Sequence, residues 1–330
     1  MHRVTVIGTG SIGERHARCF LQTKRAEVGI CEIDEVVRAR MRNTYALTAE
    51  YADFSQVLQS EPGVAVICTP VQLHIAMAQQ LVEAGFHVLI EKPLSTDLDG
   101  VQALLASIES RQRQAAVAYV LRASPLLEQA RQVVQSGELG GLVEVVAVGG
   151  QHFPTYRPAY REIYYRDRET GGGAIQDALT HWVNVVEWVA GPMDCVAADC
   201  DRLVLEGVNT EDSVNAIARH GDTMVNYSLN QHQAPNETVF RFVCRRGVVE
   251  VLMHEQVCRL GKDPMGPWQS VMTANLERDD VFVAQANRFL DVVEGNASPA
   301  CTVQEGLSTL HANLAILQAA DSRQWVSITP

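Results

Sequence analysis

The sequence lacks several features that mark particular classes of protein. It contains no run of Lys or Arg, and its 27 Lys and Arg residues stand against 39 Asp and Glu, which gives a formal net charge of -12 at pH 7. Nucleic-acid binders usually present a basic stripe, because each phosphate contact needs a cation. Nucleic acid and anionic membranes are therefore not expected as partners.

Long apolar segments are also absent. The longest apolar runs have about the length of one strand, so no stretch is expected to span a bilayer. The first residues, MHRVTVIG, contain no charged region followed by an apolar one and predict no signal peptide. We expect a cytoplasmic protein.

Cysteine is present but without a pattern. The 8 cysteines form no CxxC pair, and none lies with histidine at the spacing of a zinc site. We expect reduced and mostly buried thiols, and we expect no metal site.

The order of predicted elements indicates two domains. Over about the first 120 of the 330 residues, apolar strands alternate with amphipathic helices, which is typical of a parallel sheet covered on both faces. Longer β-type runs follow, joined by turns such as HGD and RRG, and predict a mainly antiparallel sheet. We therefore predict an α/β fold with a Rossmann domain over residues 1–122 and a second α/β domain over residues 123–330.

The stretch GTGSIG at residues 8–13 predicts a dinucleotide-binding turn. Gly8 would allow the tight turn after the strand, Gly10 would let the backbone approach a pyrophosphate, and Gly13 would let the helix pack on the strand. The N–H groups at the helix start would then face the phosphates. A simple glycine-rich turn is the alternative, but the position between an apolar strand and a helix favours nucleotide binding.

An acidic residue ends the second predicted strand. Glu32 lies 19 residues after Gly13, where a carboxylate accepts hydrogen bonds from a ribose diol and repels a 2′-phosphate. Asp34 and Glu35 add negative charge, and the nearest cation, Arg38, is a helical turn further on. These residues predict NAD rather than NADP as the cofactor.

The motif EKP gives the first candidate catalytic residue. Glu91, Lys92 and Pro93 follow the apolar strand HVLI, and ligands of open α/β sheets bind at the carboxyl ends of the strands. A lysine there can donate a hydrogen bond to a substrate oxygen. A solvated surface lysine is the alternative, and the position after a buried strand favours a catalytic Lys92.

A second set of candidates follows three glycines. Asp177 and His181 are four residues apart, so on a helix they share one face. A carboxylate beside an imidazole can orient it and favour its protonated form. We predict His181 as the acid/base and Asp177 as a substrate-binding or orienting residue. An idle pair on an exposed helix is the alternative, although the apolar flanking residues favour burial.

Residues 152–169 are dense in Tyr and Arg. They either line a polar sugar-binding pocket or form an ordinary surface or subunit-contact segment. His74 is similarly open, with either a place beside the nicotinamide or a capping and packing role. The candidate substrate-binding residues outside the pair above are His152, Tyr156, Arg157, Tyr160, Arg161 and Tyr164.

Taken together, GTGSIG, CTPVQLH, EKP, GGGAIQDALTH and RRGVVEV resemble the Gfo/Idh/MocA oxidoreductases, the family of glucose–fructose oxidoreductase and inositol dehydrogenase. The resemblance covers essentially the whole chain. It implies a second domain that binds substrate and packs through its sheet, so we expect a homodimer or homotetramer. It also implies hydride transfer between NAD and a secondary hydroxyl of a sugar, sugar derivative or cyclitol.

The resemblance assigns roles to individual residues. Lys92 would contact the reacting hydroxyl, Asp177 would be the substrate-site acid and His181 the acid/base, and the Lys92–Pro93 bond is often cis in such proteins. The family often has glycine at the position of Leu179 and an acid at that of Asn184. The implied cofactor-binding residues are Gly8, Thr9, Gly10, Ser11, Ile12, Gly13, Glu32, Thr69, Pro70, His74, Glu91 and Lys92.

Two other functions stay open. Some proteins of this family use NAD transiently and act as redox-neutral glycosidases or lyases. A non-enzymatic NAD-dependent sensor is the third possibility, and the presence of Lys92, Asp177 and His181 together speaks against it.

Overall fold

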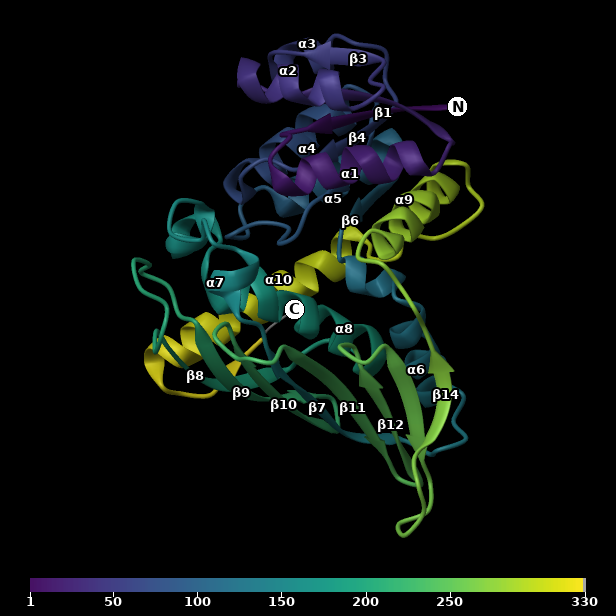
Figure 1. Cartoon of the computed structure of the whole chain (residues 1–330), viewed down its shortest axis with the longest axis vertical. Coiled ribbons are helices and arrows are strands. Elements are labelled where there is room, and N and C mark those ends of the chain that lie inside the picture. The colour runs from purple at the N-terminus through teal and green to yellow at the C-terminus, as the bar shows by residue number, and fades with distance from the viewer. Residues whose placement is uncertain (329–330) are drawn as a thin grey trace. The chain divides into compact units, whose positions relative to one another are not determined.

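The computed structural model describes residues 1–328, which divide into two compact units, each described here by itself (Figure 1). The first unit comprises Met1–Ala123 and Leu276–Leu307, and the second comprises Ser124–Asn275 and the residues from Ser308 onward. Each unit is built from one sheet with helices against it, so the predicted α/β fold class is confirmed.

The first unit contains a parallel sheet of six strands in the order β3-β2-β1-β4-β5-β6. The chain enters at β1 and winds outward in both directions, so the strand order reverses between β1 and β4. In sheets of this kind ligands bind outside the carboxyl ends of the strands at that reversal. The strands are β1 (His2–Ile7), β2 (Ala26–Cys31), β3 (Ala49–Tyr51), β4 (Val64–Ile67), β5 (His87–Ile90) and β6 (Ala115–Val117).

Helices cover this sheet and shield strands that are apolar on both faces. Its core cluster joins Val4 and Val6 of β1 to Ala17 and Phe20 of the first helix, all of them at most 1% exposed. The helices of the unit are α1 (Ser11–Gln22), α2 (Glu35–Thr44), α3 (Phe54–Leu58), α4 (His74–Glu83), α5 (Val101–Arg111) and α9 (Asp280–Val293).

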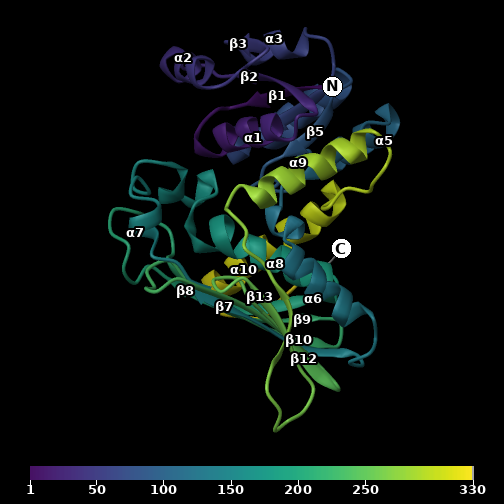
Figure 2. The same cartoon turned by 45° about the vertical axis from the view of Figure 1, so that its right-hand side comes forward.

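One part of the first unit comes from far along the chain. Helix α9 lies beside α1 in both views, and its Phe289 and Leu290 belong to the same core cluster as β1 (Figures 1 and 2). The sequence prediction placed residues 276–307 in the second domain, and the structure places them in the first unit. The apolar face of α9 is visible in the sequence, but the sheet against which it packs is not.

The second unit contains a sheet of nine strands in the order β14-β13-β12-β11-β7-β10-β9-β8-β15. Neighbouring strands are antiparallel except for β7 and β10, so the predicted mainly antiparallel sheet is confirmed. The strands are β7 (Leu142–Gly150), β8 (Cys195–Asp201), β9 (Ser213–His220), β10 (Thr223–Asn230), β11 (Glu237–Cys244), β12 (Gly247–Leu252), β13 (Val257–Gly261), β14 (Gln269–Thr273) and β15 (Val326–Ser327).

The two faces of this sheet differ in what covers them. Along β9, Val214, Ala216 and Ala218 are buried, whereas Asn215 and Ile217 between them are exposed, as expected for a sheet with one covered face. Helices α6 (Pro125–Gln135) and α8 (Thr180–Ala190) pack on the covered face, and the part of α10 (Val303–Ser322) that belongs to this unit lies there too (Figures 1 and 2). Within residues 1–328 no helix is both long and apolar enough to cross a membrane.

Candidate active site

The glycine turn of the first unit connects β1 to α1. Gly8 has a φ of +83°, and a Cβ atom there would lie 2.9 Å from the carbonyl oxygen of Cys68, so both conformation and space require glycine. A Cβ on Gly13 would lie 1.9 Å from the carbonyl oxygen of Gly8, because α1 starts directly against the turn. The fold itself thus explains the first and third glycines of the motif.

The middle glycine has a different explanation. Gly10 is the N-terminal cap residue of α1, no side chain caps the helix there, and a Cβ atom would meet nothing within 4 Å. The protein fold does not require glycine at this position. Open space beside the uncapped N–H groups of a helix start fits a pyrophosphate that approaches the backbone, which is the contact expected of the second glycine in a dinucleotide site. Ser11 is exposed and Ile12 half-buried beside it.

Glu32 lies directly against this turn. One carboxylate oxygen accepts hydrogen bonds from the backbone N–H and the hydroxyl of Thr9, at 2.8 and 3.0 Å, and the other accepts from the backbone N–H of Asp34 at 3.1 Å. Thr9 is fully buried, so its side chain acts by holding Glu32 rather than by reaching outward. The structure therefore brings together the predicted pyrophosphate turn and the predicted ribose acid.

The EKP motif follows β5, and its glutamate is buried. Glu91 Oε1 lies 2.6 Å from His16 Nε2 of α1, and Glu91 Oε2 accepts the backbone N–H of Lys92 at 2.9 Å. Burial by itself raises the pKa of Glu91, but the hydrogen bond and charge of His16, together with Lys92, hold that pKa below its usual value. Glu91 thus fixes the backbone that presents Lys92. His16 was not a predicted site residue, and its one signal is a titratable side chain on the apolar face of α1.

A second buried imidazole holds the other side of this turn. His74 is 2% exposed, and its ring nitrogens lie 3.1 Å from the carbonyl oxygen of Pro93 and 3.0 Å from that of Thr69. Burial lowers the pKa of His74 although both carbonyls oppose the shift. The sequence left two roles open for His74. Its burial and its two backbone contacts fit the packing role, so we do not propose that it contacts the cofactor directly.

Lys92 is half-buried, and it lies between Glu91, which His16 holds, and Pro93, whose carbonyl His74 holds. The Lys92–Pro93 bond is cis, as the resemblance implies. Thr69 and Pro70 follow β4, the strand next to β5, and are less buried than His74. The predicted cofactor-binding residues, Lys92 included, therefore follow the carboxyl ends of β1, β2, β4 and β5.

Asp177 and His181 lie in the second unit at the junction of two helices. Asp177 is in a π-helical turn, Ile175–Leu179, that runs directly into α8, where His181 is the second residue. π-Helical turns are rare and are found frequently at functional sites. Both side chains are half-buried, and Asp177 Oδ1 accepts a hydrogen bond from the hydroxyl of Tyr164 at 2.6 Å. Tyr164, a candidate of the Tyr- and Arg-rich segment, thus contacts Asp177 directly.

The start of the π-helical turn is held by a glutamate that the sequence did not suggest. Glu211 is 3% exposed and accepts the backbone N–H of Ile175 at 3.0 Å, and Arg168 lies 3.1 Å from its other oxygen. Gly173 has a φ of +92°, and a Cβ atom there would lie 2.4 Å from the Glu211 carboxylate. The glycine run before Asp177 therefore makes room for Glu211, and nothing in the sequence marks this acid among its neighbours.

Helix α8 is fixed from its other side. Within the second unit, Asn184 donates to Thr309 at 3.0 Å, and Thr180 accepts from Asn313 at 2.8 Å. Asn184, which replaces an acid often found in the family, is 1% exposed and so serves packing. His181 is presented from a helix that is anchored on α10.

The Tyr- and Arg-rich segment folds around a small core of its own. This core comprises Phe153, Tyr160, Tyr165, Leu205 and Val208, each at most 3% exposed. Tyr160, expected to bind substrate, lies inside it, because its ring packs on Phe153 and its hydroxyl donates to the carbonyl of Glu206. We therefore do not propose Tyr160 as a substrate contact.

The other members of the segment lie on its outside. Tyr156 and Tyr164 are 53% and 46% exposed, Arg161 is exposed over the face of Tyr160, and Arg157 is half-buried. His152 is half-buried, with its Nδ1 2.7 Å from the hydroxyl of Thr155. Both uses of this surface that the sequence left open are compatible with exposed Tyr and Arg side chains.

Comparison with known proteins identifies the family. A family described as "Oxidoreductase family, NAD-binding Rossmann fold" matches residues 2–119, and the "GFO/IDH/MocA C-terminal domain" matches residues 127–250. The chain belongs to the Gfo/Idh/MocA family of oxidoreductases, and its first unit carries the NAD-binding Rossmann domain of that family.

Individual relatives are distant. An uncharacterized oxidoreductase, sll0816, from Synechocystis is 26% identical over 62% of this chain, but the match spans 55% of the relative's length. The protein named D-xylose 1-dehydrogenase (NADP(+)) 2 from Haloferax volcanii is 23% identical over 96% of this chain and 97% of its own. A solved levoglucosan dehydrogenase, in complex with NADH and levoglucosan, is 17% identical with a TM-score of 0.91 over the full length of both chains. At this identity the last likeness shows the fold.

The buried Glu91–His16 pair predicts how the stability of the protein depends on pH. Because the folded pKa of Glu91 lies below the usual value of 4.5, its contribution to stability is complete above that value and is lost as the pH falls through the folded pKa. Glu91→Gln leaves His16 without its carboxylate, and we expect it to lower the free energy of unfolding at pH 7 by about 3 kcal/mol and to flatten the acid limb of stability against pH.

The measurement is urea unfolding of both proteins between pH 3 and pH 8. Glu83→Gln is the matched control, because Glu83 lies exposed on α4, and this change is expected to have an effect below about 0.5 kcal/mol. Equal losses in the two variants would contradict the role given to the Glu91–His16 pair.

Proposed function

We propose that this protein is an NAD-dependent dehydrogenase that oxidises a secondary hydroxyl of a sugar, sugar derivative or cyclitol. The observation that carries the proposal is Lys92, held beside the Rossmann ligand edge by buried Glu91, in a chain that also presents Asp177 and His181. Relatives named for xylose and inositol support this substrate class.

The proposed roles follow from the chemistry of each side chain. His181 accepts the proton of the substrate hydroxyl, and the Lys92 ammonium donates a hydrogen bond to the same oxygen and stabilises its developing negative charge. Asp177 binds a second substrate hydroxyl or orients His181. Bound NAD supplies the hydride acceptor for the carbon that carries this hydroxyl. The residues positioned to hold the cofactor are the glycine turn, Glu32, Thr69 and Pro70.

NAD rather than NADP is the cofactor that we propose. Family membership alone does not decide this, because the Haloferax relative is named for NADP(+). Glu32 supports NAD, since its carboxylate is held at the end of β2 and would repel a 2′-phosphate.

We further propose that copies of the chain associate through the uncovered face of the nine-stranded sheet. Ile217 of β9 and Met224 of β10 are 49% and 51% exposed there, although both lie in the middle of a sheet. Light scattering of the intact protein measures the mass, and a monomer at assay concentration would contradict this proposal.

The experiment that tests the function is NADH absorbance with pure protein, NAD and a panel of cyclitols, aldoses, uronic acids and amino sugars. A substrate-dependent rise in absorbance at about 340 nm, where NADH absorbs, supports the dehydrogenase. Confirmed NAD binding with a cleaved glycoside and no net NADH would instead support the redox-neutral enzyme. Binding without any turnover would support the sensor.

Replacement of Lys92 tests its role at the reacting oxygen. We expect Lys92→Ala to lower kcat at least about a hundredfold, or about 3 kcal/mol of transition-state stabilisation, with the Kd for NAD changed less than about threefold. Lys262→Ala is the matched control, because Lys262 is exposed at the β13–β14 turn. Near-normal kcat in Lys92→Ala would remove Lys92 from the proposed mechanism.

Replacement of Tyr164 tests the hydrogen bond to Asp177. Tyr164→Phe removes only the hydroxyl that donates to Asp177 Oδ1. We expect kcat/KM for the substrate to fall about tenfold, because a hydrogen bond to a charged group contributes about 1.5 kcal/mol, while the Kd for NAD stays unchanged. Steady-state kinetics and calorimetry measure the two quantities, and a parallel loss of NAD binding would point to a folding defect rather than to Asp177.

A further inference from the structure

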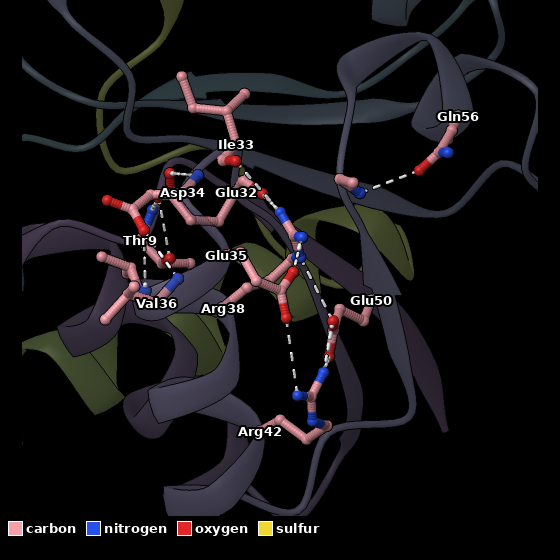
Figure 3. A network of polar contacts seen from close by, with 12 residues as sticks. Thr9, Glu32, Ile33, Asp34, Glu35, Val36, Arg38, Arg42, Glu50 and Gln56 are labelled. Carbon is pink, nitrogen blue, oxygen red and sulfur yellow. Dashed lines mark hydrogen bonds and ion pairs between the residues drawn. The ribbon is translucent and has the colours of Figure 1, made fainter.

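A cluster of two arginines and two glutamates lies next to the predicted ribose site, and we call Glu35, Arg38, Arg42 and Glu50 the Arg–Glu cluster (Figure 3). Glu35, Arg38 and Arg42 belong to α2, which begins just after Glu32, and Glu50 belongs to β3. The Arg38 side chain is 11% exposed, so it is largely buried.

Every nitrogen of the Arg38 guanidinium faces an oxygen of the protein. Nη1 donates to the backbone carbonyl oxygens of Glu32 and Ile33, at 2.5 and 3.3 Å. Nη2 donates to the Glu35 carboxylate, and Nε lies 3.3 Å from Glu50 Oε1. The guanidinium is therefore fully engaged by the backbone of the β2–α2 connection and by the carboxylates of Glu35 and Glu50.

The other cations nearby are paired in the same way. Arg42 donates to both oxygens of Glu50, at 2.7 and 2.9 Å, and Arg40 lies 2.9 Å from Glu14 Oε2. At the end of β2, the Glu32 carboxylate is held by Thr9 and by the backbone N–H of Asp34, and the Asp34 carboxylate caps α2. Positive charge is present around the ribose site, but each of these arginines is paired with an acid.

This arrangement bears on the choice between the two nicotinamide cofactors. NADP differs from NAD by a 2′-phosphate on the adenosine ribose, and proteins that accept it usually supply an arginine near the acid position. Arg38 is the cation nearest to Glu32 along the chain, and a guanidinium is well suited to bind phosphate in a bidentate manner. To serve there, Arg38 would have to leave two carboxylates and two carbonyl oxygens.

We propose that Glu35 and Glu50 are specificity-determining residues for the cofactor, because they withhold Arg38 from a 2′-phosphate. Glu32 repels the phosphate directly, and the Arg–Glu cluster removes the cation that would compensate for that repulsion. This inference rests on the proposed NAD binding. The competing explanation is that the cluster only fastens α2 to β3, in which case its loss lowers stability and leaves the cofactor preference unchanged.

The test is calorimetric titration of the intact protein with NAD+ and with NADP+. We expect Glu35→Gln/Glu50→Gln to bind NADP+ about tenfold more tightly than the wild-type protein, with the Kd for NAD+ within about twofold. Added Arg38→Gln should cancel the gain, since Arg38 is the group released. The same variants are also made in a Glu32→Gln background. This background lacks the carboxylate that repels the 2′-phosphate, so NADP+ binding stays strong enough to measure.

Glu27→Gln is the matched control for charge. Glu27 is exposed in β2, and Glu27→Gln removes one negative charge, as the single variant Glu35→Gln does, without touching Arg38. An equal gain in Glu27→Gln, or no gain for NADP+ in either background, overturns the inference. If the triple variant does not fold, the single Glu35→Gln decides, because its carboxylate is 63% exposed and a released Arg38 predicts a gain that weakens as salt rises.

Failure of this inference can be told apart from failure of the proposed function. Wild-type protein that binds neither nucleotide would overturn both. Wild-type protein that binds NAD+, with an unchanged ratio of the two Kd values in the variants, overturns the role of the Arg–Glu cluster alone.

Discussion

The buried carboxylate of Glu91 is the constraint on which the first unit depends. A carboxylate that is 5% exposed must find partners inside the protein, since burial without them is strongly unfavourable. Its partners are His16 of α1 and the backbone N–H of Lys92. One buried hydrogen bond thus joins the helix that follows the glycine turn to the strand end that carries Lys92. The glycine turn and the EKP motif are therefore linked through one buried side chain.

The second unit uses the same device for its irregular segments. Asp212 is fully buried and accepts the backbone N–H groups of Leu203, Val204 and Leu205, and these bonds hold its pKa low although burial raises it. Its neighbour Glu211 accepts the N–H of Ile175 at the start of the π-helical turn. Loops have no partner strand to satisfy their N–H groups, and adjacent buried acids supply the acceptors instead.

Local patterns predicted much of this protein, and long-range contacts were beyond them. The alternation of strands and helices, the glycine turn and the EKP motif follow from near neighbours in the sequence, and the structure has the predicted fold class. The place of α9 in the first unit and the pairing of His16 with Glu91 join residues far apart in the chain. Apolar periodicity shows that a face is buried but does not say against what. The same limit explains Tyr160, whose aromatic ring suits a pocket and a small core equally well.

The small core around Tyr160 determines which side chains of residues 152–169 can be replaced without loss of packing. Proteins with this fold are matched here at 17% identity over their full length, so the scaffold tolerates nearly complete change of sequence. In residues 152–169 the buried side chains pack on Leu205 and Val208, whereas Tyr156, Arg161 and Tyr164 stay outside. Exposed side chains on this segment can change without disturbing its buried core or the nine-stranded sheet. In the proposed dehydrogenase, Lys92 and His181 lie on elements that are anchored by buried contacts, whereas substitutions at the exposed positions of residues 152–169 cost the least stability.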